Sequence, residues 1–152
     1  MRTSPIILKY SLFILLLALS FNASARQQPV CLLEQVMRER PILAELLTKA
    51  GYAPLLSCDN TYTILAPPES ALRALQAASA GEVRATLAAH ILKGNYLQSD
   101  LKEGSSIPTL AGSKLSIFRK KDQTLVNGVR ILQADSKAKN GVIHGLDNVL
   151  AI

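Results

Sequence analysis

The sequence contains no tryptophan, and aromatic residues make up only 5% of its 152 residues. Histidine and cysteine are also scarce, with two of each, at positions 90 and 144 and at positions 31 and 58. These positions do not give the closely spaced ligand pairs of a metal site, so we expect neither a bound metal nor a metal cofactor. The shortage of aromatic side chains also argues against a pocket for a large apolar ligand.

Charged residues are few as well, at 18% of the chain, whereas hydrophobic residues reach 49%. This balance excludes an intrinsically disordered chain. The length fits one domain and is too short for an enzyme with a cleft between two domains. The net charge of +6 is spread along the sequence apart from the cluster Arg119-Lys120-Lys121. We interpret that cluster as a solvated turn and expect no nucleic-acid partner.

The N-terminal residues have the three-part layout of a secretory signal peptide. Basic Arg2 and Lys9 precede an uncharged apolar run over residues 11–21, and Ala23-Ser24-Ala25 offers small residues for cleavage. The run is short for a membrane span, which needs about 20 apolar residues. An uncleaved membrane anchor is the alternative.

We therefore predict a signal peptide over residues 1–25 and one domain over residues 26–152, with its core in about 30–152. The membrane is then met only through the transient signal peptide. The mature protein is expected to be secreted, or to stay in the periplasm or cell envelope.

The two cysteines lie in the predicted mature part. An even number of cysteines in an oxidising compartment favours a disulfide between Cys31 and Cys58. Such a bridge would stabilise the fold by roughly 3 kcal/mol in the chain-entropy model. Two separate buried thiols are the alternative.

Apolar periodicity predicts helices first and strands afterwards. The order of the expected elements indicates an α+β fold, with helices packed on a mostly antiparallel sheet or sandwich. The pairs Asn127-Gly128 and Asn140-Gly141 predict hairpin turns. The expected helices cover residues 30–40, 41–50, 69–78 and 82–92, and the expected strands cover 61–66, 107–110, 115–118, 125–126, 129–132 and 142–150.

Three segments together resemble the fasciclin-like domain family. Residues 61–72 read TYTILAPPESAL, residues 87–94 read LAAHILKG, and residues 140–150 read NGVIHGLDNVL. The last segment matches its family motif almost residue for residue. The middle one departs from its motif, because Ala89 stands where an aromatic residue usually precedes the histidine. The resemblance extends over nearly all of the predicted mature chain.

This resemblance implies a secreted, non-catalytic module for adhesion to a cell surface or matrix, or for protein interaction. Its partner is then a surface protein or a carbohydrate, it needs no cofactor, and its oligomeric state is left open. Some animal members carry an Asp-Ile pair linked to integrin binding. Asp135 and Ser136 stand at those positions here, so integrin recognition is not expected.

By resemblance and expected exposure, we predict a binding surface at Asp135, Lys137 and Lys139, on a loop before the last motif. Loops on a rigid scaffold are frequent sites of binding residues. A groove for a small apolar ligand between helices and sheet is the alternative function.

The remaining motif residues are expected to be structural, and no residue is predicted to be catalytic. His90 is expected to pack at a helix C-terminus and His144 to lie inside a strand. Asn140 and Gly141 are expected to form a turn. Asp147 is expected to accept a backbone or Ser/Thr hydrogen bond and to tie the last strand to the helices. Ser70 has no His or Lys at catalytic spacing.

Overall fold

The computed structural model describes residues 28–151. The predicted signal peptide lies outside the described residues, and among those residues no helix is long and apolar enough to cross a membrane. In chain order the elements are α2 Leu32–Glu39, α3 Pro41–Lys49, β1 Tyr62–Ala66, α4 Glu69–Gln76, α5 Ala80–Ala88, β2 Ile91–Lys93, β3 Ser106–Pro108, β4 Lys114–Lys120, β5 Gln123–Val126, β6 Val129–Ala138 and β7 Gly141–Leu146.

The first two helices follow from local signals. Leu32 and Val36, one helical turn apart, are the buried residues of α2. Pro41 begins α3 at its first position, where the missing N–H group costs no hydrogen bond. Gly51 follows the end of α3 with a φ of +78°, a backbone conformation that glycine adopts without a steric penalty.

The starts of α3 and α5 are capped in different ways. Ser79 and Glu82 form a capping box at the start of α5. Hydrogen bonds from Ser79 lower the pKa of Glu82. The start of α3 has no local cap, and the Glu69 carboxylate accepts from the N–H groups of Ile42 at 3.1 Å and Leu43 at 3.3 Å. A residue of α4 therefore caps α3.

The helix predicted over residues 82–92 is wrong beyond Ala88. Ile91 and Leu92 lie instead in strand β2, which pairs antiparallel with β1. Ile91 packs with the helices, whereas Leu92 packs in the second hydrophobic core on the other side of the sheet. A short apolar run cannot by itself distinguish a buried strand from a helix end, and pairing with β1 decides in favour of the strand.

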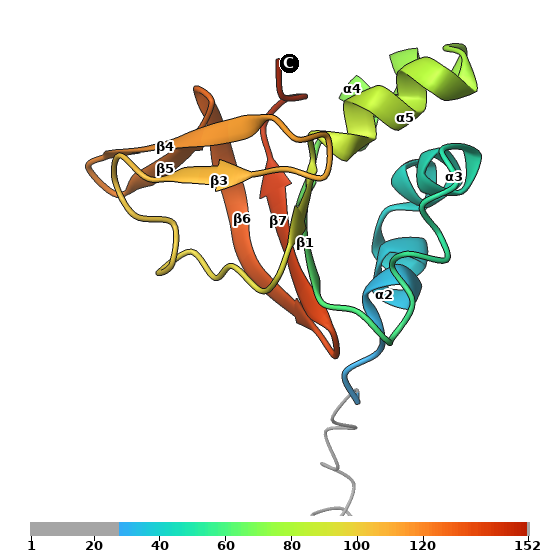
Figure 1. Cartoon of the computed structure of the whole chain (residues 1–152), viewed down its shortest axis with the longest axis horizontal. Helices are drawn as coiled ribbons and strands as arrows, with labels where there is room; N and C mark the ends of the chain where they lie inside the picture. The colour runs from blue at the N-terminus through green and yellow to red at the C-terminus, as the bar shows by residue number, and fades with distance from the viewer. Residues whose placement is uncertain (1–27, 152) are drawn as a thin grey trace, which may run out of the picture.

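The seven strands form one sheet in the order β2-β1-β7-β6-β5-β4-β3. Only the β1–β7 pair is parallel, so the predicted α+β class with a mostly antiparallel sheet is confirmed. The strand predicted over residues 129–132 continues to Ala138, and the one predicted over 142–150 ends at Leu146. The helices lie on one side of β1 and β7, and β3–β5 lie on the other (Figure 1).

Strands β1 and β7 separate two hydrophobic cores. Ile64 and Ile143 face the helices and belong to the first core. Leu65 and Leu146 face the opposite way, into the second core with residues of β3–β6. Because both faces of β1 and β7 are covered, every residue of the two strands is buried. This fully buried pair is the rigid base of the site described next.

Candidate functional site

Strand β6 is irregular at the predicted binding residue Asp135. Its pairing with β7 shifts between Ile131 and Gln133 and again between Gln133 and Ser136. Asp135 lies in the second irregularity with a φ of +58°, in the left-handed region that L side chains rarely adopt. The prediction of a loop here is wrong, because β6 runs through the segment and bulges instead of ending.

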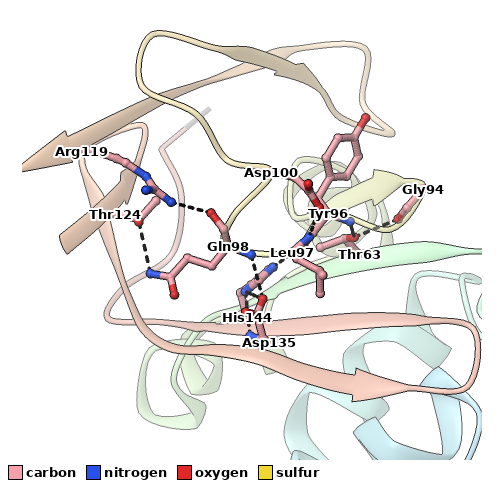
Figure 2. A network of polar contacts seen from close by, with 10 residues as sticks. All are labelled: Thr63, Gly94, Tyr96, Leu97, Gln98, Asp100, Arg119, Thr124, Asp135 and His144. Atoms are coloured by element: carbon pink, nitrogen blue, oxygen red, sulfur yellow. Dashed lines mark hydrogen bonds and ion pairs between the residues drawn. The ribbon is translucent and has the colours of Figure 1, made fainter. Parts of the chain in front are cut away.

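His144 of β7 supports this bulge from beneath. The Asp135 N–H group donates to His144 Nδ1 at 3.2 Å. The opposite ring nitrogen, Nε2, is 2.7 Å from the carbonyl oxygen of Tyr96 and donates to it. These partners assign a ring proton to Nε2 and the acceptor role to Nδ1. His144 is fully buried and joins β6, β7 and the segment after β2 (Figure 2).

Gln98 connects the bulge to the β4–β5 hairpin. Its N–H group donates to Asp135 Oδ1 at 2.8 Å, and its side-chain amide donates to Thr124 Oγ1 at 3.3 Å. Arg119 donates through Nη2 to the Gln98 carbonyl at 2.6 Å and through Nε to the Leu101 carbonyl at 3.1 Å. Figure 2 shows these side chains bridging three separate strands.

The segment between Gly94 and Leu101 is anchored at its other end by Thr63. The Thr63 hydroxyl donates to the Gly94 carbonyl at 2.8 Å and accepts from the Tyr96 N–H group at 2.9 Å. Asp100 Oδ2 accepts from the Leu97 N–H group at 2.9 Å within the segment. A chain stretch without regular secondary structure is thus held at both ends (Figure 2).

An open groove of about 480 Å³ lies beside the bulge. We call it the Asp135 groove. It is lined by Gln98, Ser99, Arg119, residues 121–124 and Asp135. All of the lining residues are polar or charged. The Asp135 side chain is 38% exposed. The groove can therefore offer hydrogen bonds and charges to a ligand.

The other two predicted binding residues lie elsewhere. Lys137 is exposed on β6 and lines a different hollow, together with Gln35, Arg38 and Glu39 of α2. Lys139 is exposed in the turn after β6, and its N–H group donates to the Val30 carbonyl at 2.8 Å. The structure thus places Asp135 apart from the lysines, on a separate hollow of the surface.

His90 lies in the turn between α5 and β2 and is 1% exposed. Its Nδ1 donates to the Thr86 carbonyl at 2.8 Å, and its Nε2 accepts from the Leu150 N–H group at 3.0 Å. Burial lowers the pKa of His90, and the weaker opposing effect is the hydrogen bond to Thr86. Both ring nitrogens of His90 are therefore engaged by backbone groups.

The predicted turn at Asn140-Gly141 is displaced by one residue. Ala138 pairs with Gly141, so Lys139 and Asn140 form the turn and Gly141 already belongs to β7. A Cβ atom on Gly141 would lie 2.0 Å from the Tyr62 carbonyl oxygen, which only glycine avoids. By contrast, Asn127 and Gly128 form the predicted β5–β6 hairpin, with φ of +47° and +82°.

The Asn140 side chain joins segments far apart in the sequence. Its Oδ1 accepts from the Leu32 N–H group at 2.7 Å, and its Nδ2 donates to the carbonyls of Ser57 and Asn60, both at 2.7 Å. These segments also contain the disulfide Cys31–Cys58, whose Cα atoms are 5.4 Å apart. Asn140 and the disulfide therefore hold the same junction together.

Asp147 accepts a backbone hydrogen bond as predicted, but the predicted link to the helix layer is wrong. Its Oδ1 accepts from the Arg130 N–H group at 3.1 Å, and its Oδ2 lies 3.5 Å from Arg130 Nε. Asp147 follows the end of β7, beside the start of β6, and its partner is therefore the neighbouring strand. Within residues 28–151, no three His, Cys, Asp or Glu side chains converge as metal ligands would.

Sequence reasoning missed Gln98, Thr124 and most of the Asp135 groove. Gln98 lies in a stretch with no periodic signal, and Thr124 looks like any polar strand residue. Arg119 and Lys121 were noticed only as part of a solvated basic turn. Long-range hydrogen bonds bring these residues together, and no local pattern indicates them.

The sequence of this chain is similar to that of a known family. Residues 39–152 match the profile of the Fasciclin domain. The chain is 32% identical over 116 residues to transforming growth factor-beta-induced protein ig-h3 of Sus scrofa, across 72% of this chain and 17% of that protein. It is 27% identical over 117 residues to protein sll1483 of Synechocystis sp., across 71% of this chain and 64% of that protein.

A solved structure shows the same fold. The FAS1 domain pair of the insect cell adhesion molecule fasciclin I superimposes with a TM-score of 0.55 and 22% identity, over 73% of this chain and 44% of that chain. This chain thus spans less than two thirds of each of the three proteins named here. Since the family profile covers most of the sequence and the fold agrees, the chain belongs to the Fasciclin domain family.

Proposed function

We propose that this chain is an exported, non-catalytic fasciclin domain that mediates adhesion to a cell surface or matrix. Membership in the Fasciclin domain family supports the assignment of the chain as a fasciclin module. Adhesion is supported by a structural relative that is a cell adhesion molecule. The Cys31–Cys58 disulfide supports export, because such bonds persist in oxidising compartments.

The observation that carries the proposal is the Asp135 bulge. It holds polar groups at the surface in a fixed arrangement, through hydrogen bonds to Gln98 and His144. Rigid, exposed polar groups suit recognition, because little conformational freedom is lost on binding. Lys137 and Lys139, which lie apart from the Asp135 groove, form a second contact region of the proposed surface, on β6 and the turn that follows.

The histidines support a role without catalysis. Each ring of His90 and His144 is buried, and both nitrogens of each ring are engaged by backbone groups. Neither ring is placed to exchange a proton with a bound substrate. The hollows described at the surface include charged side chains in their linings, so no observation favours a carrier of small apolar ligands.

The test is attachment of protein-coated beads to the surface of the native host's cells. Two variants are compared with the unaltered protein: Lys137→Ala/Lys139→Ala and Asp135→Asn. Each should attach about tenfold more weakly, because hydrogen bonds to charged groups are removed. Asn tolerates the positive φ of position 135, so melting temperatures should remain close to that of the unaltered protein.

A matched control is the Lys93→Ala/Lys114→Ala variant, which loses the same charge from two exposed strand positions elsewhere. It should attach like the unaltered protein. Equal attachment of all variants would refute the proposed surface. Absence of attachment by the unaltered protein would refute the adhesive function itself.

A further inference from the structure

We propose that the Asp135 groove binds a neutral, hydroxyl-rich saccharide. This inference deepens the proposed function and rests on it, since it names the chemical class of the partner. It is carried by three features of the groove: its backbone conformations, its charge balance and its fixed polar groups.

Backbone strain is concentrated at the groove. Among the described residues, three that are not glycine have a positive φ: Lys121 at +54°, Asn127 at +47° and Asp135 at +58°. Two of these three, Lys121 and Asp135, line the groove. Glycine would adopt these conformations at lower steric cost. Lys121 lies in the two-residue turn between Lys120 and Gln123, where hairpin geometry calls for positive φ. Asp135 lies in a strand bulge and carries a charged side chain there, as at sites where strain is retained for binding.

The charges at the groove are balanced. Arg119 and Lys121 supply two positive charges, and Asp122 and Asp135 supply two negative ones. The two carboxylates would repel an acidic polymer, and the two basic groups would repel a cationic ligand. A neutral ligand with many hydroxyl groups avoids both conflicts, because each hydroxyl both donates and accepts hydrogen bonds.

The available polar groups match hydroxyl chemistry. Asp135 Oδ1 accepts from the Gln98 N–H group and lies 4.0 Å from His144 Nδ1. Asp135 Oδ2 has no hydrogen-bond partner among residues 28–151, so that oxygen is open to a ligand hydroxyl. The Gln98 amide donates to Thr124, which leaves its carbonyl oxygen as an acceptor at the groove. Lys121 and Gln123 add donors from the hairpin side. Carboxylate, amide and ammonium groups thus surround the space from two sides.

The groove is also large enough and held in place. Its volume of about 480 Å³ falls within the range of roughly 300–1,000 Å³ usual for small-molecule sites. Arg119 fixes Gln98, Gln98 fixes Asp135, and His144 fixes the Asp135 backbone (Figure 2). Polar groups that are ordered before binding lose little entropy when a sugar arrives.

The experiment uses an array of immobilised oligosaccharides, with neutral glucans, mannans and galactans beside acidic hyaluronan and heparin fragments. The mature protein should bind neutral members, and its binding should hardly change with salt, because no net charge is neutralised. Calorimetry with the best neutral oligosaccharide then compares variants. Lys121→Gly and Asp135→Asn should each weaken binding about tenfold or more.

Folding is controlled within the same series. Lys121→Gly keeps the hairpin and removes strain, so its melting temperature should not fall. Lys120→Ala is the matched control, since it removes the same charge one residue away and outside the Asp135 groove. It should bind the oligosaccharide like the unaltered protein.

Three results would overturn the inference: no neutral oligosaccharide binds, only acidic ones bind in a salt-dependent way, or both groove variants bind normally. Attachment of beads to host cells, measured in parallel, separates this inference from the proposed function. Attachment without sugar binding refutes the saccharide and leaves adhesion standing. Sugar binding lost in the variants, without attachment by any protein, supports the saccharide site and refutes adhesion.

Discussion

The two histidines carry their protons on different ring nitrogens, and backbone partners impose each choice. His90 donates from Nδ1 to Thr86 and accepts at Nε2 from Leu150. His144 does the reverse, accepting at Nδ1 from Asp135 and donating from Nε2 to Tyr96. At His90, a second ring proton would face the Leu150 N–H group, and burial also lowers the pKa of this ring.

His90 leads to a prediction about acid. Burial holds its pKa below the ordinary value of 6.5, so the unfolded chain binds a proton at a higher pH than the folded chain does. The contribution of neutral His90 to the free energy of unfolding is therefore fully present above about pH 6.5. It is lost as the pH falls toward the pKa of His90 in the folded state. The free energy of unfolding, measured with urea from about pH 7.5 to about pH 5, should decrease.

The control is His90→Gln, which does not titrate in this range. It should be less stable at neutral pH but should show a shallower loss with acid, because the carboxylates that also titrate are the same in both proteins. Equal slopes for the two proteins would contradict the assigned role of His90.

At the scale of elements, one substitution should have opposite effects in a strand and in a helix. Gly141 begins β7, and a Cβ there would lie 2.0 Å from the backbone oxygen of Tyr62 in β1. Gly81 lies in α5, where the nearest atom to an added Cβ is Ser79 Oγ at 4.0 Å. Gly141→Ala should destabilise by about 3 kcal/mol or more, and Gly81→Ala should stabilise by about 1 kcal/mol.

Urea unfolding of the two variants and the unaltered protein measures the change in the free energy of unfolding for each substitution. The change should be a decrease for Gly141→Ala and an increase for Gly81→Ala. The helix substitution serves as the control for the strand substitution, because the chemical change is identical. If the Gly141→Ala variant were as stable as the unaltered protein, β1 and β7 could move apart without a loss in the free energy of unfolding. This would contradict the close pairing of the two strands.

Element boundaries show where local patterns suffice. The first strand and the Asn127-Gly128 hairpin were predictable, because β-rich composition ending at a proline pair and turn chemistry act within a few residues. The end of α5 and the bulge of β6 were not. Leu92 is assigned to a strand only by pairing with Thr63, and β6 continues past Leu132 only because β7 pairs along it.

At the scale of the whole molecule, the disulfide and Asn140 act on one junction. Cys31–Cys58 links the start of α2 to the loop before β1, and Asn140 binds backbone groups of Leu32, Ser57 and Asn60. Replacing both cysteines by serine should lower the free energy of unfolding by about 3 kcal/mol. Asn140→Ala should cost about 2 kcal/mol, because buried backbone groups lose their partners.

Because both features restrain the same segments, the combined variant should lose less than the sum of the two costs. A double-mutant cycle by urea unfolding measures this coupling under matched conditions. Strict additivity would mean that the disulfide and Asn140 stabilise the fold independently.

The sequence by itself determined the α+β class, the fasciclin resemblance and the pairing expected of the two cysteines. These rest on periodicity, composition and contiguous motifs, which are local properties of the chain. Only the tertiary structure decided the capping of α3 by Glu69, the partner of Asp147 and the Asp135 groove. Each of these depends on groups from separate segments, such as Gln98 and Asp135, and their contacts exist only once those segments have packed together in the folded chain.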